Sequence, residues 1–256
     1  MHPKRPENSA ITEPIPPPLR EPLHRFMSAL KSACATDLVS VVLFGSLARG
    51  DFNPHSSDAN LLLIFKTVTP ALLEKIAPAL EAASREFDPS PLILAEADLP
   101  VCADVFPIKF RDIQRHHIVL LGKATLSSLN LTPERLRRQC QRELQNMLLR
   151  LRFVFMQKSK FPEALASALT QNASPFIHAL AVVVELLGGE IPNSKPATIS
   201  AASKLNLDCD VLHAISDLKQ GAVAPSVDVL KTHYAAFLNL IEQTIGKLTP
   251  SNDLAR

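Results

Sequence analysis

The segment LVSVVLFGSLARGDFNPHSSDANLLLIF, residues 38–65, decides the expected fold of this chain. Its first seven residues, 38–44, and its last seven, 59–65, are almost entirely apolar, which is typical of strands buried on both faces of a sheet. The residues between them are rich in Gly, Ser, Asn and Asp, which favour turns. The segment therefore predicts two buried strands joined by a polar connection that begins abruptly at Gly45.

The polar connection carries groups suited to a nucleotide and a cation. Gly45 allows the backbone to turn sharply and to approach a ligand closely. Ser46 and the amides after it could hold phosphate oxygens, and Arg49 could either meet a phosphate or remain solvated. Asp58 and Asn60 are two residues apart on a predicted strand, so their side chains point to the same face. Such a pair suits Mg²⁺, which prefers carboxylates together with substrate phosphates.

Outside this segment, the pattern changes from mixed to helical along the chain. Up to Gly122, helical spacing alternates with short strand-like runs, which indicates an α/β arrangement. The expected helices there are 21–35 and 70–86, and the expected further strands are 91–95 and 104–110. Beyond Gly122 we expect helices at 133–158, from Ser174-Pro175 to Gly188, at 210–220 and at 226–248. The sequence thus predicts a flexible Pro-rich arm (1–20), a first domain (21–122) and an α-helical domain (130–250).

Composition narrows the class of protein. The 256 residues are 46% hydrophobic and 20% charged, as in a soluble globular protein, and a net charge of +2 does not indicate nucleic acid as a partner. The four cysteines are scattered without a CxxC or Cys/His pattern, so we expect buried thiols rather than zinc ligands or disulfides. No apolar run approaches the ~18 residues of a membrane span, and the N-terminal residues lack the apolar core of a signal peptide. We therefore expect a cytoplasmic protein that does not bind a membrane.

Residues 41–65 resemble the signature of the nucleotidyltransferase superfamily, which has the DNA polymerase β-like fold. In that signature Gly-Ser precedes an Asp-x-Asp pair, and a third acid lies on a later strand. The Ser-Asp-x-Asn form, the later VFPIKFRDIQRHHIVLLG (105–122) and the Arg-rich helix that follows are similar to a bacterial group of predicted nucleotidyltransferases. These carry a C-terminal helical domain, much as aminoglycoside adenylyltransferases do. The resemblance implies an α+β chain: a mixed sheet with helices, followed by an all-α bundle.

The resemblance also assigns roles to individual residues. Gly45 and Ser46 match the phosphate-binding pair, and Asp58 matches the first metal-binding acid. Asn60 stands where most active members have the second acid, and Lys109, on the expected strand 104–110, stands where relatives usually have Glu. Two Mg²⁺ ions some ~3.5–4 Å apart need several carboxylates to hold them. The metal site is therefore expected to be incomplete, with Lys109 either neutralising a nucleotide phosphate or pairing with Asp58.

Three functions are compatible with these residues. The resemblance implies transfer of a nucleotidyl group from an NTP to an unknown acceptor, with Asp58 and Asn60 holding Mg²⁺ and with Gly45, Ser46, Arg49 and Lys109 binding the nucleotide. The alternative is a catalytically inactive nucleotide-binding or regulatory member, a pseudoenzyme, because two expected carboxylates are replaced. The third is a protein-interaction scaffold that uses the helical bundle and binds no nucleotide.

Overall fold

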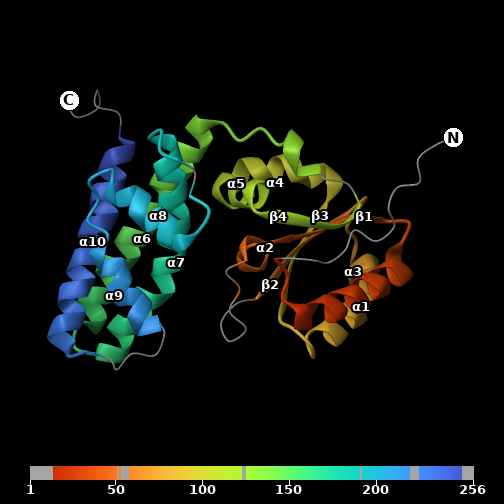
Figure 1. Cartoon of the computed structure of the whole chain (residues 1–256), viewed down its shortest axis with the longest axis horizontal. Helices are drawn as coiled ribbons and strands as arrows, with labels where there is room; N and C mark the ends of the chain where they lie inside the picture. The colour runs from red at the N-terminus through yellow and green to blue at the C-terminus, as the bar shows by residue number, and fades with distance from the viewer. Residues whose placement is uncertain are drawn as a thin grey trace. The chain divides into compact units, whose positions relative to one another are not determined.

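The structure is a computed structural model, and it describes residues 14–50, 52, 58–122, 125–190, 192–219 and 225–249. The chain divides into two compact units, Met1–Leu131 and Thr132–Arg256. Figure 1 labels the helices and strands of both units. Among the described residues, no helix is both long enough and apolar enough to cross a membrane.

The first unit is built on a four-stranded mixed sheet. The strands are β1 (Leu38–Phe44), β2 (Ala59–Phe65), β3 (Pro89–Ala95) and β4 (His117–Gly122), in the order β3-β2-β1-β4. β1 runs antiparallel to β2 and to β4, whereas β2 and β3 are parallel. The predicted strands 38–44 and 59–65 are confirmed at both ends, and β3 starts slightly before the predicted residue 91.

Helices cover both faces of this sheet (Figure 1). Because side chains alternate along a strand, β1 and β2 supply two separate apolar cores. One core joins Val41, Leu43, Leu61 and Leu63 to α1 (Pro17–Cys34) and α3 (Pro70–Ala83). The other joins Val42, Phe44, Leu62 and Ile64 to α4 (Leu99–Val105) and α5 (Pro107–Arg115). Each fully buried aliphatic side chain contributes about 1.5–3 kcal/mol to folding, so both faces fix the strands firmly.

The predicted strand at 104–110 is wrong, because this segment is helical. α4 ends at Val105, and α5 begins at Pro107, a residue whose missing N–H costs nothing at the first position of a helix. Phe110 and Ile113 are buried at helical spacing against the sheet. The alternating apolar residues in the sequence suggested a strand, but packing of α5 on the sheet determines the structure.

The N-terminal helix begins earlier than expected. α1 starts at Pro17 rather than at Glu21, and Ile15, before the helix, is only 1% exposed. Residues 14–20, assigned to the arm from sequence, therefore include residues that pack into the first unit. The rest of the predicted arm, 1–13, lies outside the described residues.

The described part of the second unit is all helical, which confirms the predicted fold class of a mixed sheet followed by helices. Its helices are α6 (Pro133–Lys158), α7 (Pro162–Leu186), α8 (Lys195–Ser203), α9 (Asp210–Lys219) and α10 (Val227–Leu248). α6, α7 and α10 pack on one another. The Tyr234 hydroxyl donates a hydrogen bond of 2.9 Å to the Leu151 carbonyl, which ties α10 to α6 within the core.

The predicted helix start at Ser174-Pro175 is wrong, because α7 runs through Pro175. A proline inside a helix removes one backbone hydrogen bond and strains the preceding turn. Pro175 is exposed, whereas Phe176 and Ile177 beside it are buried. Burial of the apolar residues beside Pro175 outweighs the lost hydrogen bond. The local sequence around Ser174-Pro175 could not show this balance.

The cysteines agree largely with the expectation of buried thiols. Cys34, Cys140 and Cys209 are buried and Cys102 is half-buried, and all four are free. Burial raises the pKa of the Cys140 thiol to about 12. This thiol therefore stays neutral and unreactive at physiological pH, since the thiolate is the reactive form.

Candidate functional site

The turn after β1 is closed tightly against β2. Gly45 has φ 75° and ψ −148°, a conformation that is essentially restricted to glycine. A Cβ atom at this position would lie 2.9 Å from the Asn60 Nδ2 atom, so a larger residue would collide with Asn60. Ser46 then begins α2 (Ser46–Arg49), and the Gly50 N–H donates to the Ser46 carbonyl at its end. Gly45 therefore allows the turn to pass directly over Asn60.

Asp58 and Asn60 lie at the same edge of the sheet as this turn. Asp58 is exposed and precedes β2, and Asn60 is half-buried and pairs with Phe44, the last residue of β1. The Asn60 Nδ2 atom donates a hydrogen bond of 3.4 Å to the Asp58 carbonyl. Asn60 alternates with Leu62 and Ile64, so it lies on the sheet face covered by α4 and α5. The structure thus places Gly45 and Asp58 next to Asn60, although Asp58 precedes β2 and does not lie on the strand as expected.

Arg49 forms an ion pair that the sequence did not reveal. Its Nη1 atom donates to both carboxylate oxygens of Asp112 on α5, at 3.1 and 3.0 Å. The Arg49 side chain is 9% exposed and the Asp112 side chain 30%, so the pair is partly shielded from water. Asp112 was missed because 63 positions separate it from Arg49 and because its neighbourhood was predicted as a strand. The pair connects α2 to α5.

Lys109 lies on α5 and not on a strand beside β2. It is exposed and precedes Asp112 by three residues, so the two share one side of the helix. The strand that adjoins β2 on its other side is β3, and the residue in register with Asn60 is Ser90. The expectation that Lys109 lies on a strand is therefore wrong. Sequence reasoning also missed Ser90, since the register of a parallel pair leaves no local signal in the sequence.

A further carboxylate lies near this edge. Asp88 precedes β3 and is exposed, and its carbonyl accepts a hydrogen bond of 2.8 Å from the Ala59 N–H. Asp58 and Asp88 thus both occupy the position just before the first β2–β3 pair, Ala59 with Pro89. Within the described residues, no group of three or more His, Cys, Asp or Glu side chains is arranged to hold a metal ion. The donors present fit one hard cation that also takes phosphate oxygens better than they fit two ions.

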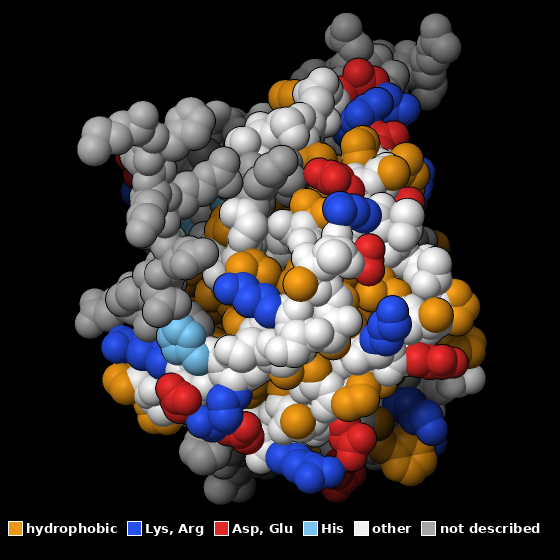
Figure 2. Space-filling model, turned by 90° about the vertical axis from the view of Figure 1, so that its right-hand side faces the viewer, with side chains coloured by type: hydrophobic (Ala, Val, Ile, Leu, Met, Phe, Trp, Pro, Cys, Tyr) orange, Lys and Arg blue, Asp and Glu red, His pale blue; other side chains and the backbone are white. Residues whose placement is uncertain are grey.

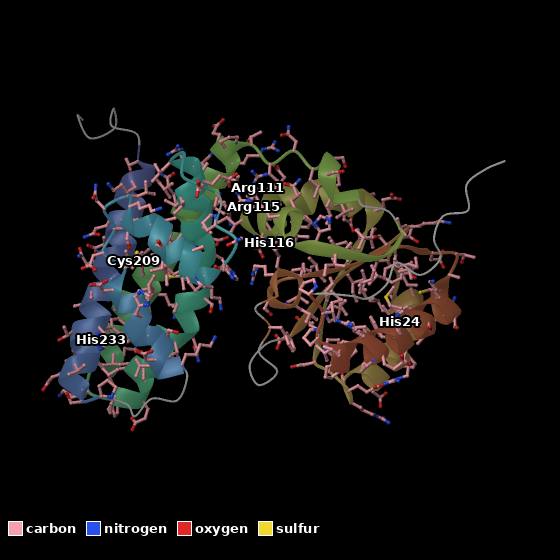
Figure 3. The ribbon with its side chains drawn as sticks, viewed as in Figure 1. His24, Arg111, Arg115, His116, Cys209 and His233 are labelled. Atoms are coloured by element: carbon pink, nitrogen blue, oxygen red, sulfur yellow. The ribbon has the colours of Figure 1, made fainter. Side chains whose placement is uncertain are left out.

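Basic side chains continue along α5. Arg111, Arg115 and His116 lie on this helix and at its end (Figure 3). The Arg111 Nη1 atom donates to the Gln114 Oε1 atom at 3.4 Å, and Gln114 in turn donates to the Leu126 and Leu129 carbonyls. On the face shown in Figure 2, by contrast, the Lys and Arg side chains of the described residues are mixed with Asp and Glu and form no continuous basic surface.

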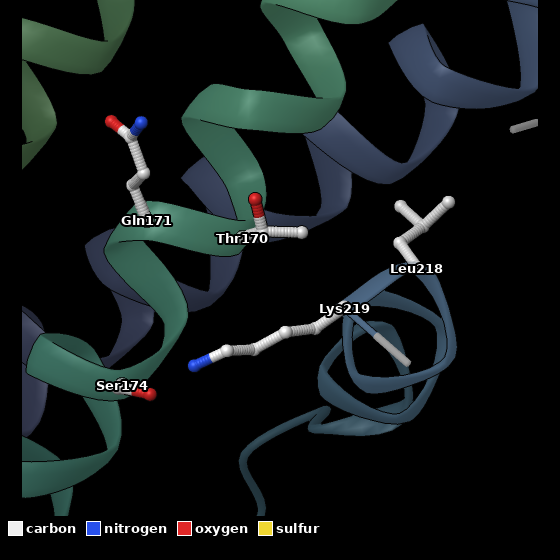
Figure 4. A pocket seen from close by; sticks show the side chains of 5 residues that line it. All are labelled: Thr170, Gln171, Ser174, Leu218 and Lys219. Atoms are coloured by element: carbon white, nitrogen blue, oxygen red, sulfur yellow. The ribbon is translucent and has the colours of Figure 1, made fainter. Parts of the chain in front are cut away.

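The second unit contains a cavity of a different kind. It has a volume of about 380 Å³ and is lined by Thr170, Gln171, Ser174, Leu218 and Lys219. Lys219 extends from α9 towards the turn of α7 that carries Ser174 (Figure 4). The Lys195 amine also lies 3.5 Å from the Ser174 hydroxyl. None of these lining residues carries a carboxylate, so they offer a metal–nucleotide complex only neutral oxygen ligands beside the Lys219 amine.

Comparison with known proteins gives a family match within the first unit. Residues 26–115 match the model of the family described as nucleotidyltransferase domain. This range contains Gly45, Ser46, Asp58, Asn60 and Asp112. A search of curated proteins found no significant match.

Among solved structures, the chain is similar to spectinomycin adenyltransferase AAD(9) from Enterococcus faecialis, crystallised with ATP and spectinomycin. The two chains are 13% identical and superimpose with a TM-score of 0.51, over 89% of this chain and 98% of the other. At this identity the likeness concerns the fold. The chain therefore has the nucleotidyltransferase fold, and its residues 26–115 match the nucleotidyltransferase domain family.

Proposed function

We propose that this protein transfers a nucleotidyl group from an NTP to an acceptor hydroxyl, at the sheet edge formed by Gly45, Ser46, Asp58 and Asn60. The observation that carries the proposal is the close approach of the Gly45 backbone to Asn60, next to the exposed carboxylate of Asp58. Both features lie within the segment that matches the nucleotidyltransferase domain family. A structural relative crystallised with ATP makes ATP the first donor to test.

The proposed roles follow from the chemistry of each group. The first N–H groups of α2 have no partner within the helix, so the Ser46 and Leu47 amides can donate to phosphate oxygens. The Asp58 carboxylate and the Asn60 amide oxygen would hold one Mg²⁺ together with the triphosphate. When bound, this ion withdraws charge from the α-phosphate and from the leaving pyrophosphate. Proteins of this fold usually use a divalent metal, which supports its inclusion.

The reaction itself is a substitution at phosphorus. The acceptor oxygen forms a bond to the α-phosphorus, and the bond from that phosphorus to the bridging oxygen breaks and releases pyrophosphate. The acceptor proton passes to solvent. Asp58 and the α2 amides hold the phosphates in place, and such positioning supplies much of the rate enhancement in phosphoryl-group transfer.

The second candidate function is nucleotide binding without transfer. Asn60 and Ser90, side by side in register, are neutral at a position where carboxylates would be expected to collect a metal ion. A site in which these two positions carry no charge could retain ATP while failing to activate it.

Pyrophosphate release separates these two functions. We would measure it with ATP and Mg²⁺ against a panel of hydroxyl-bearing acceptors, in the wild type and in Asp58→Asn, with the exposed Asp217→Asn as a matched control. Transfer predicts acceptor-dependent release that Asp58→Asn abolishes and Asp217→Asn preserves. ATP binding without release for any acceptor would favour the second function, and release unaffected by Asp58→Asn would contradict the proposed site.

A further inference from the structure

We infer that Asp112 is a positioning residue for the phosphate-binding turn, acting through its ion pair with Arg49. The inference rests on the proposed function, because it assigns Asp112 a role at the same site. Asp112 lies on α5, outside the turn itself, and the family match assigns no role to it.

The turn has little stability of its own. α2 contains four residues, far fewer than the roughly 12 that an isolated helix needs to be even marginally stable. It lies between Gly45 and Gly50, which have φ values of 75° and 79°. Glycine adopts many backbone conformations, so neither end of α2 restricts its orientation. Contacts made by its side chains must therefore hold it in place.

Two such contacts attach α2 to opposite layers of the first unit. Leu47 is fully buried, and it belongs to the core that joins the sheet to α1 and α3. Arg49 reaches Asp112 on α5, which packs on the other face of the sheet. These two attachments add to the contacts that α2 makes with β1, β2 and β4. The two together fix the direction of the Ser46 and Leu47 amides.

Because Arg49 is charged, loss of its ion pair with Asp112 should affect the position of α2. The Arg49 side chain is only 9% exposed, and both oxygens of Asp112 accept from the same Nη1 atom. Without the carboxylate, the guanidinium, which is largely shielded from water, would lose two hydrogen bonds and one neutralising charge, which is unfavourable. We expect the side chain to move towards solvent and to displace α2 with it. Displacements of about 1 Å in a binding site can reduce rates by about 100-fold.

The test compares Asp112→Asn, which keeps the shape of the side chain, with the exchange Arg49→Asp/Asp112→Arg. Glu81→Gln serves as the control, because it removes an ion pair with Arg85 that is largely exposed. Two quantities are measured on the full chain: amide hydrogen exchange of residues 46–50 without nucleotide, and the dissociation constant for ATP with Mg²⁺. Melting temperature is followed in parallel.

We expect Asp112→Asn to accelerate exchange of residues 46–50 by about tenfold or more and to weaken ATP binding by about tenfold to 100-fold. The double variant Arg49→Asp/Asp112→Arg should recover a large part of the protection from hydrogen exchange and of the ATP affinity. Glu81→Gln should match the wild type in both measurements. A lower melting temperature with unchanged exchange and affinity would overturn the inference, because it would show a purely structural role. If the wild type binds no nucleotide, the proposed function fails, and the exchange measurement alone decides whether Asp112 holds α2.

Discussion

Two regions of the described chain gather polar side chains, and they differ in charge and in construction. At the sheet edge, Asp58 and Asn60 offer oxygen ligands, and Gly45 approaches Asn60 so closely that a Cβ atom there would lie 2.9 Å from the Asn60 Nδ2 atom. The cavity between α7 and α9 offers the Lys219 amine and neutral groups. The first region suits a cation with phosphates, and the second suits an anion. The proposed nucleotide site is therefore chosen by the type of donor and not by the presence of a cavity.

The largest expected effect is that of Gly45→Ala, which would disrupt the close approach of the turn at Gly45 to Asn60. The new Cβ atom would lie 2.9 Å from Asn60 Nδ2, on a backbone conformation that alanine rarely adopts. Backbone strain alone costs about 1–3 kcal/mol. We expect loss of measurable ATP binding in a calorimetric titration and a lower melting temperature.

Gly188→Ala is the matched control for this change. Gly188 also has a positive φ, 81°, but nothing lies within 4 Å of the position of its Cβ atom. It should lower the free energy of unfolding by about 1–2 kcal/mol through strain, with ATP affinity unchanged. Equal loss of ATP binding in both variants would mean that the contact with Asn60 is irrelevant.

Adding carboxylates at the sheet edge should make ATP binding there depend more strongly on Mg²⁺. Asn60→Asp and Ser90→Asp each add a charge beside Asp58, because Ser90 is in register with Asn60. We expect each to increase the Mg²⁺ dependence of ATP affinity by about tenfold, roughly the effect of one further carboxylate ligand. The measurement is the ratio of ATP dissociation constants with and without Mg²⁺.

Lys109→Glu is the comparison for these two variants. It adds the same charge on the exposed side of α5, and not on β3. Its effect on the Mg²⁺ dependence should be smaller than that of Ser90→Asp. The reverse order would show that the third acid of the signature does belong at position 109.

The smallest effect is expected in the second unit. Lys219→Ala removes the amine from the cavity between α7 and α9, and Lys219 is exposed on α9. ATP affinity should change by less than about twofold, within the usual effect of a surface substitution. A loss comparable to that of Asp58→Asn would require the nucleotide to contact this cavity and would remove the distinction between the two regions.

The sequence predicted the elements whose apolar residues form unbroken local patterns. The strands 38–44 and 59–65 and the helix 133–158 could be predicted because burial on one or both faces determines their composition directly. Gly45 follows β1 and Asp58 precedes β2, so the two predicted strands place both residues near Asn60.

The features that were missed depend on packing between distant segments. α5 was mistaken for a strand because Val105, Ile108 and Phe110 give an ambiguous apolar pattern, which only contact with the sheet resolves. The Arg49–Asp112 pair and the register of Ser90 with Asn60 each join positions far apart in sequence. No local pattern encodes such pairings, so the environment of the site could be known only from the structure.

The most direct test of the proposed site is calorimetric titration of the wild type and Asp58→Asn with ATP, each with and without Mg²⁺. We predict that the wild type binds ATP more tightly when Mg²⁺ is present, and that Asp58→Asn removes this difference while leaving the melting temperature within about 2 °C of the wild type, as expected for an exposed side chain. Binding that is equal with and without Mg²⁺ in both proteins, or no ATP binding at all, would contradict the proposed site.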